Sequence, residues 1–255
     1  MAHPFGTSAK TKGRDWISPK RQLNRLISRL LRRTPTGNPS SRGSAPTRNL
    51  HFEPLEPRLL LSADLAFAVA PGSDLTLRLD NLDGIDTLVI VDNEVADPIA
   101  QILASQVLAD TSAVRITGSV GDDKLTIDQS NPFIVPISFD DLTAVDNDSL
   151  VLTGALDNIW QLAGVDAGTV GNTEYAGIEN LFGGSGNDRI IAAAGASVTG
   201  SVDAGAGVDT LDYSGRSSAI SVNLADSSAT DIGGMIGFES IIGSAAADTL
   251  TGSNG

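Results

Sequence analysis

The sequence contains no cysteine, two histidines and only 4% aromatic residues in its 255 positions. Without cysteine, disulfide bonds and thiol chemistry are excluded. Both histidines, His3 and His51, lie near the amino terminus, away from the rest of the chain. The sequence also lacks the G-x-S-x-G, H-E-x-x-H and G-x-x-x-x-G-K-S/T motifs of common hydrolases and nucleotide-binding proteins. We therefore expect a protein that is not an enzyme.

Charge divides the chain into two parts. Residues 1–58 contain 12 basic and three acidic residues, whereas residues 59–255 contain five basic and 28 acidic residues. The net charges are therefore +9 and −23, which is typical of a basic tail on an acidic body. An acidic body repels phosphates, so we expect no nucleic acid as a partner, whereas divalent cations would relieve the repulsion.

The basic tail, residues 1–50, is rich in Arg, Lys, Ser, Thr, Pro and Gly, a composition typical of disorder. Within it, apolar residues recur at helical spacing between arginines from Lys20 to Arg33. This spacing predicts a short basic amphipathic helix that ends before Pro35. Two interpretations stay open: the helix contacts an anionic membrane surface or the export machinery, or it stays solvated and docks nowhere.

Residues 51–70 form a different segment. They contain Leu55-Glu56-Pro57-Arg58, followed by Leu60-Leu61 within an apolar run that ends at Ala70. This segment resembles the LEPR-XLL segment near the amino terminus of large exported bacterial proteins, which implies a role in sorting. A basic region, a short apolar run and small residues at its end are also the parts of a secretory signal, and the run is too short for a transmembrane helix. We prefer an export signal here, and the alternative is an ordinary first β-strand.

A nine-residue pattern recurs in the acidic body. Gly183-Gly184-Ser185-Gly186-Asn187-Asp188-Arg189-Ile190-Ile191 fits G-G-x-G-x-D-x-U-x at every defined position, where U is apolar. Less complete copies begin at Gly118, Ala204, Gly243 and Gly252, and echoes of its second half lie at residues 84–89 and 146–151. In a longer repeat, Gly177–Gly183 returns 60 positions later as Gly237–Gly243.

This pattern is similar to the calcium-binding repeat of the repeats-in-toxin (RTX), or hemolysin-type, family. We therefore expect an all-β fold, a right-handed parallel β-helix or β-roll of degenerate repeats, preceded by a disordered basic arm with the short amphipathic helix. The glycines permit tight turns, and each U residue begins a short strand that points into a thin core. We divide the chain into the arm 1–50, the sorting segment 51–70, irregular β repeats 71–176 and hemolysin-type repeats 177–255.

Other segments also predict secondary structure. Short apolar segments between Gly, Asp and Asn predict strands at residues 75–79, 87–91, 114–117, 133–135, 150–152 and 221–224. Residues 98–108 instead predict a helix, because Asp97-Pro98 suits a helix start and apolar residues follow at helical spacing. We expect Trp160 and Tyr175 to pack in the core.

The resemblance implies a calcium site built from two stacked turns. In that family the Asp carboxylates and turn carbonyls hold the ion, which suits a cation that takes six to eight oxygen ligands. Carried over by position, the ligands are the carboxylates of Asp188 and Asp209 and the carbonyl oxygens of Gly183, Ser185, Gly205 and Gly207. Stacked turns should lie about 18 residues apart. These lie 21 apart, so either three residues bulge out or the turns do not align.

The alternative for each motif Asp is purely structural. An Asp in a glycine-rich turn often accepts hydrogen bonds from nearby backbone N–H groups. We interpret Asp188 as a calcium ligand, leave Asp209 open between the two roles, and interpret Asp123 and Asp248 as hydrogen-bond acceptors.

These features predict a non-catalytic, exported or cell-surface bacterial repeat protein with calcium ions as its cofactor. We expect an adhesive or structural role, with a cell-surface glycan or protein as partner. Because the sequence ends inside a repeat, we expect it to be the amino-terminal part of a larger protein. Two alternatives stay open: the scaffold of a polysaccharide-active β-helix enzyme whose catalytic part lies elsewhere, or a metal-free spacer.

Overall fold

The computed structural model describes residues 62–252, except for residues 99, 142, 144 and 145. The helix expected within Lys20–Arg33 and most of the sorting segment therefore lie outside the described residues. The chain divides into two units, Met1–Glu56 and Pro57–Gly255, and every described residue belongs to the second. The described part of this unit contains β-strands, one short 3-10 helix at Leu108–Asp110 and no α-helix. The expected all-β fold is confirmed.

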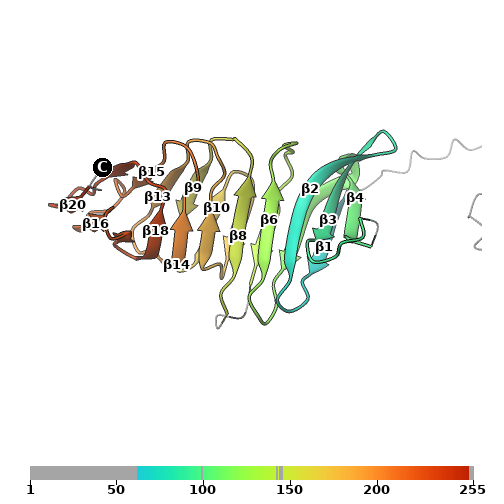
Figure 1. The fold of residues 1–255 in the computed structure, drawn as a ribbon, viewed down its shortest axis with the longest axis horizontal. Helices are drawn as coiled ribbons and strands as arrows, with labels where there is room; N and C mark the ends of the chain where they lie inside the picture. The colour runs from blue at the N-terminus through green and yellow to red at the C-terminus, as the bar shows by residue number, and fades with distance from the viewer. Residues whose placement is uncertain (1–61, 99, 142, 144–145, 253–255) are drawn as a thin grey trace, which may run out of the picture. The chain divides into compact units, whose positions relative to one another are not determined.

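The strands form two sheets, which we call sheet A and sheet B (Figure 1). Sheet A has nine strands, in spatial order β1 (Ala63–Ala68), β5 (Thr111–Thr117), β7 (Ile137–Asp140), β11 (Thr173–Ala176), β10 (Ala167–Val170), β9 (Ile159–Leu162), β13 (Arg189–Ala192), β15 (Thr210–Asp212) and β19 (Ser240–Ile242). Sheet B has eleven strands, in spatial order β20 (Thr249–Thr251), β16 (Ser221–Asn223), β17 (Ser228–Ala229), β18 (Ile232–Ile236), β14 (Val198–Asp203), β12 (Asn180–Phe182), β8 (Ser149–Thr153), β6 (Lys124–Asp128), β2 (Asp74–Leu82), β3 (Ile85–Asp92) and β4 (Ile102–Val107).

The chain passes repeatedly from one sheet to the other. Strands β5 to β8 lie alternately in sheets A and B, and so do strands β12 to β15. Strands on successive passes pair in parallel, as β6 does with β8 and β13 with β15. Three antiparallel excursions (β2-β3-β4, β9-β10-β11 and β16-β17-β18) each stay within one sheet. One pass through both sheets is a coil, and the coils stack side by side (Figure 1).

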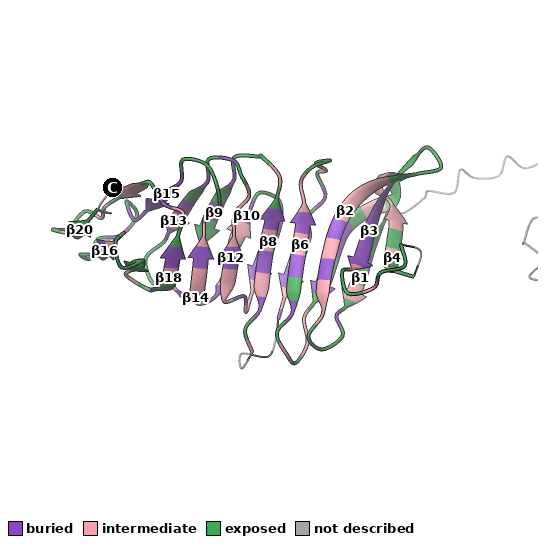
Figure 2. Ribbon diagram, in the orientation of Figure 1, coloured by how far each residue is buried: buried purple, intermediate pink, exposed green. Residues whose placement is uncertain are grey.

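The core is one hydrophobic cluster to which both sheets contribute (Figure 2). The U residues Leu125, Ile190 and Leu211 lie in it and are at most 1% exposed, as the motif predicts. Trp160 and Tyr175 are also buried, and their rings meet edge to face with centroids 6.1 Å apart, so the expectation that they pack in the core is confirmed.

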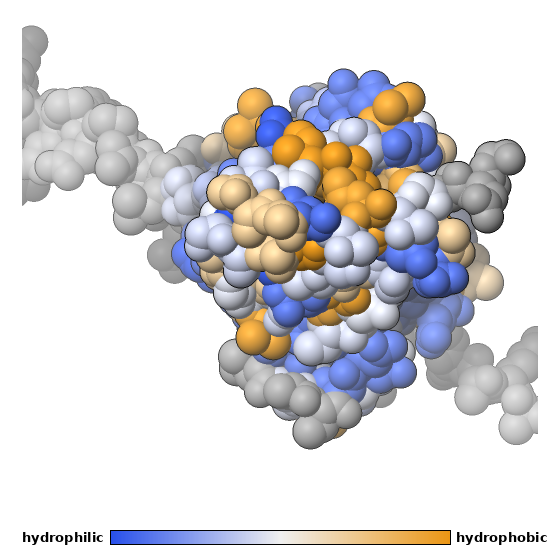
Figure 3. All heavy atoms as spheres, turned by 90° about the vertical axis from the view of Figure 1, so that its left-hand side faces the viewer, coloured by the Kyte–Doolittle hydropathy of each residue, from blue (hydrophilic) through white to orange (hydrophobic). Residues whose placement is uncertain are grey.

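The last strands differ from the rest of the stack. β19 and β20 each lie at the end of their sheet, and Leu250, the U residue of the last copy, is 51% exposed. Figure 3 views this end of the stack, where apolar surface is open; Ile236 on β18 and Ile242 on β19 are exposed. Leu250 is thus not buried, because in the described part of the chain no further strand covers it.

The helix predicted for residues 98–108 is wrong. Residues 102–107 form β4, which pairs antiparallel with β3 and places Ala104 beside Ile90. Exposure alternates along the strand, and Ala104 packs against the core while Leu103 faces solvent. The helical spacing was overridden by pairing with β3, which is buried from Thr87 to Val91.

The strand predicted at residues 133–135 is also wrong. These residues form a loop between β6 and β7, and Ile134 is 95% exposed. Pro132 and Pro136 flank the segment, and proline has no N–H group to donate to a sheet. The strand begins after them, at Ile137.

For the apolar run before Ala70, the structure shows the second of the two interpretations. Residues 63–68 form β1, which pairs in parallel with β5, and Leu65 and Val69 are buried in the core. A cleavage after Ala70 would remove β1 from sheet A. The described part of the run, residues 62–70, therefore contributes a strand and two core residues to the folded body.

Candidate functional site

Two series of turns connect the sheets at opposite edges of the coil. We call the turns that lead from sheet B to sheet A the BA corner; they include residues 154–158, 183–188, 204–209 and 237–239. We call those that lead from sheet A to sheet B the AB corner; they include residues 118–123, 141–148, 177–179 and 243–248. Both motif turns of the expected calcium site lie on the BA corner.

Acidic side chains form a ladder along the BA corner. In each step, a carboxylate accepts a hydrogen bond from the backbone N–H of the residue at the same position one coil earlier. Asp188 Oδ1 accepts from Asn158 at 2.7 Å, Asp209 Oδ1 from Asp188 at 2.6 Å, and Glu239 Oε2 from Asp209 at 2.7 Å. Each of these residues directly precedes a strand of sheet A, so the ladder fixes the register of the parallel strands.

The two motif turns align in spite of their 21-residue separation. Arg189 pairs with Thr210 and Ile190 with Leu211, so the strands that follow the turns are in register. The extra length lies in the strands, because β13 has four residues and β14 six. The doubt about alignment that the spacing raised is thereby removed.

The turn backbones approach each other closely at the motif glycines. A Cβ atom on Gly205 would lie 2.1 Å from the Gly184 oxygen, and one on Gly207 would lie 2.2 Å from the Gly186 oxygen. The structure therefore brings the six predicted ligand residues to one corner: Gly183, Ser185, Asp188, Gly205, Gly207 and Asp209.

The two motif carboxylates differ in how fully they are hydrogen-bonded. Both oxygens of Asp188 accept hydrogen bonds, Oδ1 from Asn158 and Oδ2 from the Gly184 N–H at 3.3 Å. Asp209 is 0% exposed, and its Oδ2 has no hydrogen-bond partner among the described residues. Burial raises the pKa of Asp209, and the charges of Asp188, Glu239 and Asp157 raise it further. Asp209 is therefore the motif carboxylate with an oxygen free for a cation.

A second ladder runs along the AB corner. Asp123 Oδ1 accepts from the Ser73 N–H at 2.9 Å, Asp148 Oδ1 from Asp123 at 2.7 Å, and Glu179 Oε2 from Asp148 at 2.8 Å. Glu179 here has the same role as Glu239 on the BA corner. The 60-residue repeat thus places equivalent residues on opposite corners, which shows that the repeating unit is one turn and one strand.

The interpretation of Asp123 and Asp248 as hydrogen-bond acceptors is confirmed. The second oxygen of Asp123 accepts from the Ser119 N–H at 2.8 Å. Asp248 accepts from the backbone N–H groups of Ile220 at 3.0 Å and Ser244 at 2.7 Å. Both oxygens of each carboxylate are therefore occupied by protein donors.

The AB corner also contains a carboxylate group that the motif did not predict. Asp141, Asp146 and Asp148 each offer an oxygen, and these atoms lie within 4.8 Å of one another, so the group could hold a metal ion. Asp146–Val151 was recognised only as an echo of the motif, and Asp141 belongs to no copy. Stacking brings them together: Asp148 lies 25 positions after Asp123, and β8 pairs in register with β6.

Each lysine and arginine that the structure describes forms an ion pair with a carboxylate that belongs neither to the two ladders nor to the group Asp141, Asp146 and Asp148. The five ion pairs are Arg78–Asp80, Arg115–Asp64, Lys124–Asp74, Arg189–Asp212 and Arg216–Asp231. Arg189 is half-exposed and pairs with Asp212 on the next coil. These five ion pairs therefore involve none of the carboxylates of the two ladders.

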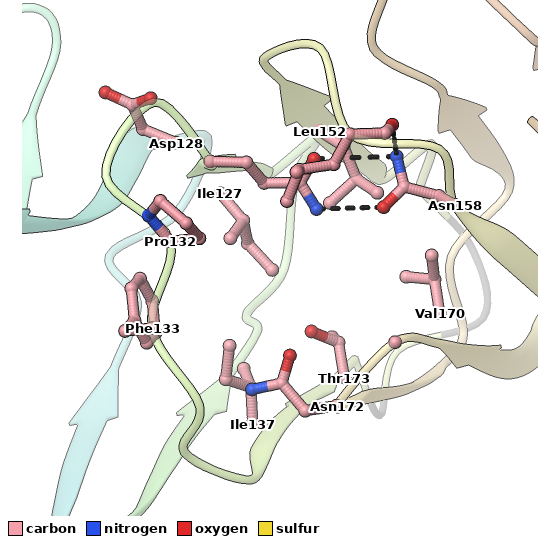
Figure 4. Close-up of a pocket in the computed structure, with 13 residues that line it drawn as sticks. Ile127, Asp128, Pro132, Phe133, Ile137, Leu152, Asn158, Val170, Asn172 and Thr173 are labelled. Atoms are coloured by element: carbon pink, nitrogen blue, oxygen red, sulfur yellow. Dashed lines mark hydrogen bonds between the residues drawn. The ribbon is translucent and has the colours of Figure 1, made fainter. Parts of the chain in front are cut away.

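A small pocket lies beside the BA corner (Figure 4). Its volume is about 150 Å³, and its walls include Ile127, Phe133, Asn158 and Val170. Pockets that bind drug-sized ligands usually measure roughly 300–1,000 Å³. The Asn158 amide is already bonded to Gln129, Leu156 and Asp188, so this pocket has little with which to recognise a ligand.

Comparisons with protein-family models, with curated proteins and with solved structures gave no match. Within the described residues, no helix is both long enough and apolar enough to cross a membrane.

Proposed function

We propose that this chain is a non-catalytic, calcium-binding repeat protein that is exported and has a structural or adhesive role outside the cell. In this proposal the stacked coils are a right-handed β-roll or β-helix of degenerate hemolysin-type repeats. Calcium ions bound at the corners offset the negative charge there and stiffen the stack, and a cell-surface glycan or protein is the partner.

The Asp209 carboxylate is the observation that carries the proposal. It occupies the defined Asp position of the motif, in a turn that stacks in register on the turn of Asp188. It is fully buried with one oxygen free of protein donors, among three other acids. A buried carboxylate oxygen without a partner is costly, and a calcium ion would remove that cost because it binds carboxylate and carbonyl oxygens.

The donor set at this corner fits calcium better than it fits a softer metal. The ligands carried over from the family are all oxygens, and the chain has no cysteine. Thiolate and imidazole ligands select zinc and copper, whereas carboxylates and carbonyls suit calcium and magnesium. Export rests on the resemblance of residues 51–70 to the LEPR-XLL segment, and it does not require removal of β1.

Calorimetric titration of calcium into the full chain, after removal of metal with EDTA, tests the proposal. We expect the wild type to bind calcium and Asp209→Asn to bind one ion fewer, because the amide keeps the Oδ1 acceptor but removes the charge. Asp248→Asn is the matched control: it changes the same motif position, where both oxygens already accept hydrogen bonds, so its binding should equal that of the wild type.

If Asp209→Asn binds as many calcium ions as the wild type, with equal affinity, the motif corner is not a calcium site. The metal-free spacer would then be the better account of these repeats.

A further inference from the structure

The loop between β7 and β8 holds three aspartates at the AB corner. Asp141 directly follows β7, and Asp148 directly precedes β8, with Asp146 between them. Their oxygens lie within 4.8 Å of one another, which is close enough for one ion to contact all three. This group uses none of the residues of the motif corner.

Two of these carboxylates are buried, and one oxygen of each accepts no hydrogen bond from the described residues. Asp148 is 0% exposed and its Oδ2 has no hydrogen-bond partner among the described residues; the same holds for Oδ1 of Asp141, which is 6% exposed. An ionised carboxylate withdrawn from water in this way is strongly unfavourable unless a cation or a proton compensates it.

Thr143 lies within hydrogen-bonding distance of two of these carboxylates, those of Asp141 and Asp146. The Thr143 hydroxyl lies 2.9 Å from Asp141 Oδ2, 2.8 Å from Asp146 Oδ2 and 3.0 Å from the Ser119 carbonyl oxygen. A hydroxyl has one proton to donate, so it satisfies only one of these three acceptors at a time. The Thr143 N–H also donates to Asp141 Oδ2 at 2.9 Å, so Thr143 reaches the Oδ2 atoms of Asp141 and Asp146 and leaves Oδ1 of Asp141 without a partner among the described residues.

Backbone N–H groups of the preceding coil donate to one oxygen each of Asp146 and Asp148. The Gly121 N–H donates to Asp146 Oδ2 at 2.7 Å, and the Asp123 N–H donates to Asp148 Oδ1 at 2.7 Å. These bonds hold the carboxylates in place against the turn 118–123. They leave Asp148 Oδ2 and Asp141 Oδ1 free, as a preformed ion site would.

Electrostatics favours a cation at this position. The pKa of Asp148 is raised from 3.8 to about 7, mainly by burial and also by the charges of Asp141 and Asp146. Glu179, at the next step of the ladder, has its pKa raised by burial and also by the charge of Asp146. The five ion pairs of the described lysines and arginines are with other carboxylates, and a cation from solution would offset the charge of this group.

We propose that Asp141, Asp146 and Asp148 bind a calcium ion at the AB corner, as a second site separate from the motif corner. The ligands are hard carboxylate oxygens, with water to complete the coordination sphere, which suits calcium better than transition metals. Because Gly121 and Asp123 donate to two of the ligands, the ion ties the loop 141–148 to the preceding turn. The proposal shares only the kind of ion with the proposed function, so the two can fail separately.

The test is calorimetric titration of calcium chloride into the EDTA-treated full chain, comparing the wild type with Asp148→Asn. We expect the variant to lose one bound ion, or to bind it at least tenfold more weakly. Its melting temperature in EDTA should equal or exceed that of the wild type, because the substitution removes a buried negative charge. Calcium should then stabilise the wild type more than the variant.

Asp248→Asn is the matched control, since Asp248 lies on the same corner at the same motif position, but both of its oxygens accept protein hydrogen bonds. Its calcium binding should match that of the wild type. If Asp148→Asn does not fold, Asp141→Asn tests the same site, because Oδ1 of Asp141 is the other free oxygen.

The proposal is overturned if whichever of these variants folds binds as many calcium ions as the wild type with equal affinity. It is also overturned if the group holds only a shared proton, seen as one extra proton bound near neutral pH and no calcium ion lost on substitution. Loss of an ion in Asp209→Asn but not in Asp148→Asn supports the motif corner alone; the reverse supports the AB corner alone.

Discussion

Asp148 and Asp209 occupy the same position in two turns at opposite corners of the stack. Each directly precedes a strand, accepts a backbone N–H with Oδ1 and keeps a buried Oδ2 without a partner among the described residues. Asp123 and Asp188 also occupy this position, but their second oxygens accept turn N–H groups. At the scale of single residues, an aspartate at this motif position can therefore be either an ion ligand or a hydrogen-bond acceptor, and the residue type alone does not distinguish the two.

The close approach of the turn backbones predicts a strong effect of alanine at Gly205. This residue has φ +94° and its Cβ would lie 2.1 Å from the Gly184 carbonyl oxygen, so both the backbone and the stacking must shift. We expect Gly205→Ala to lower the free energy of unfolding by roughly 3 kcal/mol, measured by urea denaturation.

Gly195→Ala is the control for this substitution. Gly195 has φ +79° and open space where the Cβ would lie, so only the backbone strain of about 1 kcal/mol should appear. Equal losses in the two variants would contradict the close packing of the motif turns.

The raised pKa of Asp148 predicts a pH dependence of stability in metal-free protein. With its pKa raised from 3.8 to about 7, mainly by burial, the folded chain keeps a proton here that the unfolded chain releases. The stability contributed by Asp148 is therefore present below its unfolded pKa and is lost as pH rises to about 7.

Urea denaturation in EDTA at a series of pH values measures this effect. Relative to Asp148→Asn, the wild type should lose stability as the pH rises from 3.8 to about 7, where the Asp148 carboxyl of the folded chain ionises. Parallel curves for the two proteins over this interval would show that Asp148 ionises normally.

At the scale of elements, the motif turns were the most predictable part of the molecule. Glycine and aspartate set the geometry of residues 183–188 and 204–209 locally, and the apolar U residues then begin buried strands. The alternating segments at 75–79, 114–117 and 221–224 were also predicted correctly as strands. In each case the information lies within a few consecutive residues.

Other elements depend on distant partners and could not be predicted in this way. Residues 102–107 have a helical spacing of apolar residues, yet pairing with β3 makes them a strand. Asp141 and Asp148 are brought together only in the folded chain, where Asp148 accepts a hydrogen bond from Asp123 of the turn 118–123. Asn158 was missed too, although it takes the Asp position in a degenerate turn, where a spacing of 30 residues to Asp188 was the available signal.

At the scale of the whole molecule, the coils form a stack whose two corners concentrate negative charge. Residues 59–255 carry 28 acidic and five basic residues, and the five basic residues are used in ion pairs away from the ladders. Each coil contacts mainly its neighbours, so an ion that joins successive turns should stabilise the stack over several coils. The central claim is that calcium is part of the stable structure.

The most direct measurement is the melting temperature of the full chain by differential scanning calorimetry, in EDTA and in millimolar calcium. An ion present at 100 times its dissociation constant stabilises the folded state by about 2.7 kcal/mol. We predict a clear rise in melting temperature with calcium, smaller in Asp148→Asn and in Asp209→Asn, and absent in the double variant. Equal melting temperatures of the wild type in the two buffers would contradict the claim.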